Sequence, residues 1–144
     1  MAALRVGDVL NTDGSVRVEF RLDPSQTKGR HARTVFVSEK LRKEVAAYLV
    51  TRNTAALDIP LLHTQKRAGF TANTLCQTLR TIYRDAGLDG ASSHSGRRSF
   101  ITTLANKGVG VRVLAALAGH RSISTTQRYI DVNDAMKRAA VELV

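Results

Sequence analysis

The stretch that decides the fold runs from His94 to Tyr129. It opens with HSGRRSF at residues 94–100, passes through an apolar segment, and closes with GHRSISTTQRY at residues 119–129. His94 stands three residues before Arg97, and His120 stands nine residues before Tyr129. Three cationic or titratable side chains therefore precede one phenol, on short predicted helices that glycine residues punctuate.

This set of side chains suits attack by a tyrosine on a phosphodiester. Phosphoryl transfer requires a nucleophile, an acid and positively charged donors around the equatorial oxygens of the transition state. Arg97 offers a planar, two-pronged donor to phosphate, and His94 and His120 can donate a hydrogen bond or carry a proton near neutral pH. Tyr129 would be the nucleophile that becomes covalently phosphorylated.

At these residues the sequence resembles the C-terminal catalytic core of the tyrosine recombinase (phage integrase) family. That family has a His-x-x-Arg pair, a later Gly-His, and a tyrosine nine residues beyond that histidine. The TTQRY at residues 125–129 also resembles the family's threonine-rich approach to its tyrosine. The resemblance covers nearly the whole chain. Gly96 departs from the pattern, because many members have a bulky apolar residue there; a glycine loosens a helix by about 1 kcal/mol relative to alanine.

Charge and composition favour a nucleic acid partner. The 144 residues are enough for one domain with a core, and their formal net charge of +10 points to a polyanion. Cys76 is the single cysteine, so no disulfide forms within the chain, which fits a reducing cytoplasm. The sequence has no 18-residue apolar run and no signal peptide pattern. We expect a cytoplasmic protein that binds double-stranded DNA and no membrane, and the resemblance implies that it is encoded by a bacterium, a phage or a plasmid.

The first part of the chain predicts a small antiparallel sheet with a basic loop. Apolar residues alternate with polar ones from Val16 to Leu22, which predicts a half-buried strand, and residues 34–37 form the returning strand. By resemblance, Lys28 in the loop at 25–33 is the catalytic lysine that protonates the departing 5′ oxygen of DNA. The alternative is a lysine that contacts phosphate without a proton role. The residues expected to contact DNA outside the chemistry are Arg30, Arg33, Arg98 and Arg121.

The rest of the chain predicts helices, so the fold class is mixed and mainly α: a helical catalytic core with a small antiparallel β-sheet near the N-terminus. Apolar positions Leu41, Val45, Tyr48 and Leu49 lie on one face of a first helix capped by Ser38. The second helix is expected to be capped by Thr71 and ended by Gly87, with Leu75, Leu79, Ile82 and Tyr83 as its apolar positions. The third is capped by Ser92 or Ser93, and its Phe100, Ile101 and Leu104 face inward. The remaining helices are a short one around Val113 that ends at Gly119, one that starts at the capping box 124–127, and one that starts at Asn133 or Asp134.

The apolar stripe of the last helix allows two interpretations. Residues 135–143 can dock on the chain's own core, which is the commoner arrangement. By resemblance, a terminal helix packs instead against a neighbouring protomer, and the partners would then be other recombinase protomers on DNA in a tetrameric synapse. No residues have the spacing of a metal site, and the chemistry implied by the resemblance needs neither metal nor cofactor.

The resemblance also implies a missing beginning. The family places a first arginine a few residues upstream of the segment that matches residues 3–8, and Arg5 aligns beyond that position. We therefore expect residues 1–144 to form a single catalytic domain truncated at its N-terminus, without a separate core-binding domain. The loss of one arginine–phosphate interaction costs on the order of a thousandfold in rate.

Two functions follow from this reading. The first is site-specific DNA recombination or integration, by strand cleavage and rejoining through a 3′-phosphotyrosyl link at Tyr129. The alternative is a truncated, catalytically impaired relic that binds DNA or partners a full-length recombinase. A type IB topoisomerase uses similar chemistry, but the spacing from His120 to Tyr129 favours a recombinase.

Overall fold

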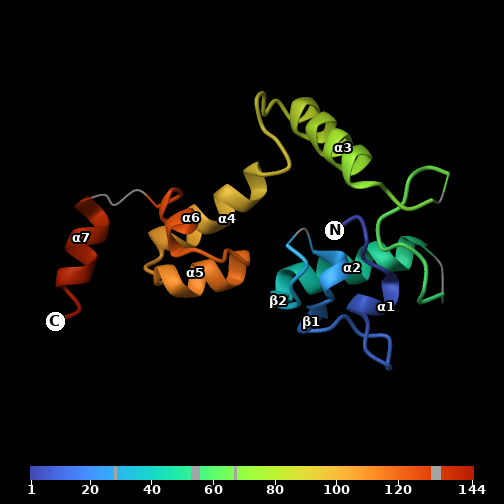
Figure 1. The fold of residues 1–144 in the computed structure, drawn as a ribbon, viewed down its shortest axis with the longest axis horizontal. Coiled ribbons are helices and arrows are strands. Elements are labelled where there is room, and N and C mark those ends of the chain that lie inside the picture. Colours follow the sequence, from blue (N-terminus) through green and yellow to red (C-terminus); the bar gives the residue numbers. More distant parts are fainter. Residues whose placement is uncertain (28, 53–55, 67, 131–133) are drawn as a thin grey trace. The chain divides into compact units, whose positions relative to one another are not determined.

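The computed structural model describes all residues except 28, 53–55, 67 and 131–133. The chain divides into two compact units, Met1–Gln77 and Thr78–Val144, and each is described by itself. The predicted fold class, mainly helical with one small antiparallel sheet, is confirmed, whereas a single domain over residues 1–144 stays a prediction. The elements, in chain order (Figure 1), are α1 (Val6–Val9), β1 (Glu19–Leu22), the 3-10 helix η1 (Pro24–Gln26), β2 (Arg33–Phe36), α2 (Glu39–Arg52), α3 (Ala72–Asp85), α4 (Ser95–Asn106), α5 (Val111–Ala118), α6 (Ile123–Gln127) and α7 (Asp134–Val141).

The predicted hairpin is present but shorter than expected. β1 and β2 pair antiparallel, with Leu22 buried opposite Arg33 and Phe20 half-buried. Val18 lies before the strand and is 60% exposed, so the prediction that the strand starts at Val16 is wrong. The reason is a competing pairing, because Val16 forms an isolated bridge with Leu10 and thereby turns toward the end of α1 instead of β2.

The core of the first unit lies between α1, α2 and the segment around Leu61. Val6, Val9 and Leu61 are buried, and Tyr48 packs against them as predicted. The Tyr48 hydroxyl donates a hydrogen bond to the Leu61 carbonyl oxygen at 3.0 Å, which satisfies the phenol at the edge of the core. Leu41 was expected on the same face of α2 but is 50% exposed.

Helix α3 starts where the sequence predicts. The Thr71 hydroxyl accepts a hydrogen bond from the backbone N–H of Thr74 at 3.1 Å, which satisfies one of the donors that a helix start leaves open. Leu75 is buried, whereas Ile82, another of the predicted apolar positions of this helix, is 55% exposed. The chain leaves α3 through Gly87, whose φ of 73° is a left-handed conformation that glycine adopts without strain.

The core of the second unit joins α4 to α5. Ile101 and Ala105 of α4 pack with Leu114 and Ala118 of α5, and Leu104, Tyr129 and Ile130 cover this cluster from the side. The expected inward positions Ile101 and Leu104 are confirmed. Phe100 is 47% exposed, because neighbouring positions on a helix point about 100° apart and Ile101 takes the direction of the core.

Replacement of Leu114 by alanine should lower the free energy of unfolding by about 2–5 kcal/mol, because Leu114 is fully buried and its loss leaves a cavity. Val113, the preceding residue on α5, is 53% exposed and provides the matched control Val113→Ala. Urea titrations followed by circular dichroism measure both variants. Equal midpoints for Leu114→Ala and the parent would contradict this account of the core.

Helix α7 has no buried residue, although Met136 is half-buried. Asp134 is its first residue and accepts a bond from the Lys137 ammonium at 2.9 Å; Asn133, the other expected cap, lies outside the described residues. Most of the predicted apolar stripe is therefore exposed in this structure. No helix among the described residues is long and apolar enough to cross a membrane.

Candidate active site

The turn before α4 presents His94 and Arg97. Backbone and hydroxyl groups of Ser92 and Ser95 hold this turn, with the Ser92 N–H donating to the Ser95 hydroxyl at 2.9 Å. The helix begins at Ser95, so His94 occupies its N-cap position without a side-chain cap bond, and the expected cap at Ser92 or Ser93 is wrong by one to two residues. His94, Arg97 and Arg98 are all exposed.

Arg97 is exposed near the start of α4. It precedes the fully buried Ile101 by one helical turn, so the two residues lie on the same side of α4. The helix start adds partial positive charge from its unbonded N–H groups. The packing of Ile101 therefore sets the rotation of α4 about its axis, and with it the side of the helix on which Arg97 lies.

Gly96, which lies between His94 and Arg97, has a neighbour that accounts for the absence of a side chain there. A Cβ at Gly96 would lie 3.3 Å from the hydroxyl oxygen of Tyr83, which is tighter than ordinary contact. Tyr83 is half-buried on α3, as its predicted packing role requires. The Tyr83 ring thus uses the space that a bulky side chain at position 96 would need.

A left-handed turn at the end of α5 places His120. Gly119 has a φ of 70° and a ψ of 33°, and the helix ends there as predicted. The His120 backbone N–H turns back and donates to the Ala115 carbonyl oxygen at 2.9 Å. The His120 side chain is half-buried, and its Nδ1 lies 2.8 Å from the hydroxyl oxygen of Thr126.

Tyr129 lies in the turn that follows α6. The helix begins after Ser122, whose hydroxyl accepts a bond from the Ser124 N–H at 3.3 Å, so the expected capping box at 124–127 is wrong. The helix also ends at Gln127, and Tyr129 is therefore outside the helix that was expected to bear it. The reason is local, because Ser122 offers its hydroxyl two residues before Ser124 can serve as a cap.

Two backbone bonds hold Tyr129 in this turn. Its N–H donates to the Thr126 carbonyl oxygen at 3.0 Å, and its carbonyl oxygen accepts from the Thr102 hydroxyl of α4 at 3.1 Å. The half-buried ring packs beside the core cluster of Ile101 and Leu114. Tyr129 is thus attached to α4 through its backbone and to the core through its ring.

The structure brings the predicted nucleophile and one predicted histidine together. The ring centroids of His120 and Tyr129 are 6.1 Å apart, and the ring planes are inclined by 31°. His94 and Arg97 lie on α4, the helix whose Thr102 binds the Tyr129 backbone. Convergence of all four side chains on one phosphate stays a prediction. Sequence reasoning missed Thr102 and Thr126, although the threonine-rich stretch before Tyr129 was visible in the sequence.

The other predicted site residues lie elsewhere. Lys28 is outside the described residues. Arg30, in the same loop, is exposed and has a φ of 51°, and the nearby Thr27 hydroxyl binds both the N–H and the carbonyl oxygen of His31. Arg33 is half-buried in β2, whereas Arg121 is exposed between α5 and α6. Among the described residues no group of histidine, cysteine, aspartate or glutamate side chains could hold a metal ion.

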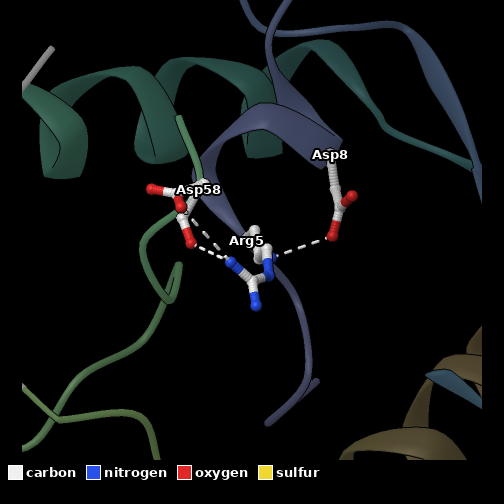
Figure 2. A network of polar contacts seen from close by, with 3 residues as sticks. All are labelled: Arg5, Asp8 and Asp58. Atoms are coloured by element: carbon white, nitrogen blue, oxygen red, sulfur yellow. Dashed lines mark hydrogen bonds and ion pairs between the residues drawn. The ribbon is translucent and has the colours of Figure 1, made fainter. Parts of the chain in front are cut away.

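Arg5 has a structural environment of its own, which Figure 2 shows. Its guanidinium contacts the backbone carbonyl oxygen of Asp58 and lies 3.9 Å from the Asp58 carboxylate. Its backbone N–H donates to the Asp8 carboxylate at 2.9 Å. The same carboxylate oxygen accepts from the Gln26 amide at 2.8 Å. These contacts join α1 to the hairpin loop and to the segment before Leu61.

The sequence matches a known protein family and several curated proteins. A model of the Phage integrase family matches residues 1–136. Tyrosine recombinase XerA of Pyrococcus horikoshii is 31% identical over 119 residues, which is 80% of this chain and 40% of that protein. Tyrosine recombinase XerC of Erythrobacter litoralis is 36% identical over 116 residues, 79% of this chain and 37% of that protein. The chain thus spans about two fifths of the length of these curated relatives.

Two solved structures share the fold. A crystal structure of XerA recombinase superposes with a TM-score of 0.75 at 24% identity and covers 99% of this chain and 49% of that one. A post-cleavage complex of the XerH site-specific recombinase with a palindromic difH substrate gives a TM-score of 0.65 at 23% identity, over 89% of this chain and 36% of that one. At these identities the likeness shows the fold alone.

Proposed function

The chain belongs to the phage integrase family, and from this premise we propose that it carries out site-specific DNA recombination by strand cleavage and rejoining. The observation that carries the proposal is the pairing of the His120 and Tyr129 rings, with the Tyr129 backbone bound to the helix that presents Arg97. The relatives named tyrosine recombinases support the reaction class.

Tyr129 is the proposed nucleophile. Its hydroxyl oxygen attacks the scissile phosphorus, a new O–P bond forms, and the bond from phosphorus to the 5′ oxygen breaks. The strand is then held as a 3′-phosphotyrosyl ester, so the reaction needs no cofactor and consumes no nucleotide. The phenol must lose its proton as it attacks, and His120 or His94 accepts it.

Arg97 stabilises the pentacovalent phosphate in this mechanism. Its exposure on the first turn of α4 makes the guanidinium accessible to DNA, and the positive end of the helix adds to its field. A bidentate donor suits two equatorial oxygens of the transition state, where charge accumulates. His94, one turn earlier, supplies a further donor to the same phosphate.

The departing 5′ oxygen takes its proton from Lys28 in this proposal. An expelled alkoxide needs an acid, and a lysine ammonium can supply the proton. The support for this role comes from the sequence, since Lys28 is outside the described residues. Rejoining reverses the steps, with a 5′ hydroxyl of the exchanged strand attacking the phosphotyrosine.

Strand exchange also requires further partners. Arg30, Arg33, Arg98 and Arg121 are the proposed contacts to the DNA backbone. Other recombinase protomers on DNA, in a tetrameric synapse, are the proposed protein partners, and the exposed apolar residues of α7 support this. We propose a cytoplasmic location, because the relatives named tyrosine recombinases come from an archaeon and a bacterium and the proposed substrate is DNA.

Covalent trapping tests the chemistry. The substrate is a pool of duplexes of randomised sequence, each nicked so that the short fragment with the 5′ hydroxyl diffuses away after cleavage. We expect a labelled strand that stays on the protein in denaturing gel electrophoresis and is released by protease. Salt-sensitive DNA binding without any trapped strand would overturn the enzymatic proposal and leave a DNA-binding module.

DNA binding should weaken on added salt, because cationic side chains release counterions from the phosphates they neutralise. The slope of log K against log salt is expected to be about −0.9 for each neutralised phosphate. The variants Arg98→Gln and Arg121→Gln should each reduce the slope by about that amount. Arg84→Gln is the matched control, since the Arg84 guanidinium lies 3.4 Å from the Asp85 carboxylate. Fluorescence anisotropy measures the series, and a slope near zero for the parent would contradict the DNA interface.

A further inference from the structure

Thr126 is the single polar residue that is buried among the residues the structure describes, with 0% of its surface exposed. A buried hydroxyl needs a hydrogen-bond partner, because an unpaired one costs about 1–3 kcal/mol. The partner here is the imidazole of His120, whose Nδ1 lies 2.8 Å from the Thr126 hydroxyl oxygen. The bond is therefore shielded from water by the same packing that buries the threonine.

The same residue also holds the predicted nucleophile. Its carbonyl oxygen accepts the Tyr129 backbone N–H at 3.0 Å. Thr126 thus contacts both members of the ring pair, the histidine through its hydroxyl and the tyrosine through its backbone. Thr125, the neighbouring residue of α6, is exposed and serves as an internal comparison.

We propose that Thr126 is a positioning residue that fixes the orientation of the His120 ring for catalysis. The proposal rests on the proposed function. With Nδ1 bound to Thr126, Nε2 is the ring nitrogen that acts in the reaction. When His120 serves as the base, its Nδ1–H donates to the Thr126 hydroxyl oxygen, and Nε2 takes the proton from the Tyr129 hydroxyl as the O–P bond forms.

A hydroxyl suits either role of the histidine. Threonine can accept a bond from Nδ1–H or donate one to an unprotonated Nδ1, by rotation of its hydroxyl hydrogen. If His120 instead donates from Nε2–H to the phosphate, the Thr126 hydroxyl donates to Nδ1 and the ring keeps the same orientation. An ionised carboxylate at this position could only accept a bond from Nδ1–H, whereas a hydroxyl can also donate to an unprotonated Nδ1 and so supports both neutral tautomers.

Two substitutions separate positioning from packing. Thr126→Val keeps the branched shape and removes the hydroxyl, whereas Thr126→Ser keeps the hydroxyl and removes a methyl group. We expect Thr126→Val to reduce the single-turnover rate of strand trapping about 10–100-fold at saturating DNA, the range typical of residues that orient a catalytic ligand, with unchanged DNA affinity. Thr126→Ser should recover most of the parental rate, and Thr125→Val should retain all of it.

A packing role predicts the opposite order, since Thr126→Ser would then be the impaired variant. Thermal unfolding by circular dichroism verifies that each variant is folded at the assay temperature. A folded Thr126→Val protein that traps DNA at the parental rate would overturn the proposal. A Thr126→Ser protein that is as slow as Thr126→Val would also overturn the proposal.

The imidazole nitrogen resonances provide a readout that needs no DNA. In ¹⁵N-histidine protein, the signals of His120 are assigned by their loss in His120→Gln. Thr126→Val should move the Nδ1 resonance toward the value of an unbonded imidazole, while Thr126→Ser and Thr125→Val leave it in place. If the parent traps no DNA, the proposed function fails. The Thr126–His120 bond is then still judged by these spectra, and an unchanged Nδ1 resonance in Thr126→Val refutes it.

Discussion

Tyr129→Phe is expected to abolish covalent trapping of DNA while DNA binding keeps its parental affinity and salt dependence. The substitution removes one oxygen atom, and that atom is the proposed nucleophile, so no other group in the turn can form the phosphotyrosyl bond. The phenyl ring remains able to pack beside Ile101 and Leu114. The measurement is the labelled strand that stays with the protein in a denaturing gel.

Tyr83→Phe is the matched control for this experiment. Tyr83 is also half-buried in the second unit, and its hydroxyl faces Gly96 instead of a phosphate. It should trap DNA as the parent does. Equal trapping by Tyr129→Phe and the parent would show that the nucleophile has been assigned to the wrong residue.

The second large effect is expected for Arg97→Lys, which should lower the trapping rate about 10²–10³-fold. The substitution keeps the positive charge but loses the planar fork that can bind two phosphate oxygens at once. Loss of one preorganised donor to a developing oxyanion typically costs this much. Because the charge remains, affinity for DNA and its salt slope should change little.

The rate is best measured in single-turnover experiments with DNA in excess, so that binding does not limit it. Arg112→Lys is the control, since Arg112 is exposed on α5 and has no proposed role. A parental rate for Arg97→Lys would mean that Arg97 provides only charge. A large loss of affinity would instead assign Arg97 to DNA binding before the chemical step.

Local signals predicted much of the fold. The hydroxyl of Thr71 and the glycine at 119 mark helix ends through interactions within a few residues, and both ends are found where expected. Errors arose where neighbouring positions offered alternatives that the hydrophobic pattern does not distinguish. Val16 alternates like a strand residue, yet it pairs with Leu10. Phe100 is apolar, yet the direction of the core is set by Ile101.

The candidate site could likewise be predicted only in part. The spacing of His94, Arg97, His120 and Tyr129 is visible in the sequence, because it follows from positions along the chain. The hydrogen bond between His120 and Thr126 could not be predicted from the sequence, because periodicity does not show which side chains come into contact across a turn. Thr125 and Thr126 are the same residue type at adjacent positions, and only the three-dimensional structure distinguishes the exposed one from the buried one.

The attachment of Tyr129 has a consequence for the entropy of activation. Its N–H and carbonyl oxygen are bonded to residues of α6 and α4, and its ring rests on the core, so the backbone at this position is already ordered before DNA arrives. What remains for the phenol oxygen is chiefly rotation about χ1, a choice among a few staggered wells, because this oxygen lies on the axis of χ2. Most of the conformational entropy that must be lost to position the nucleophile is therefore lost during folding, and less remains to be lost when DNA binds.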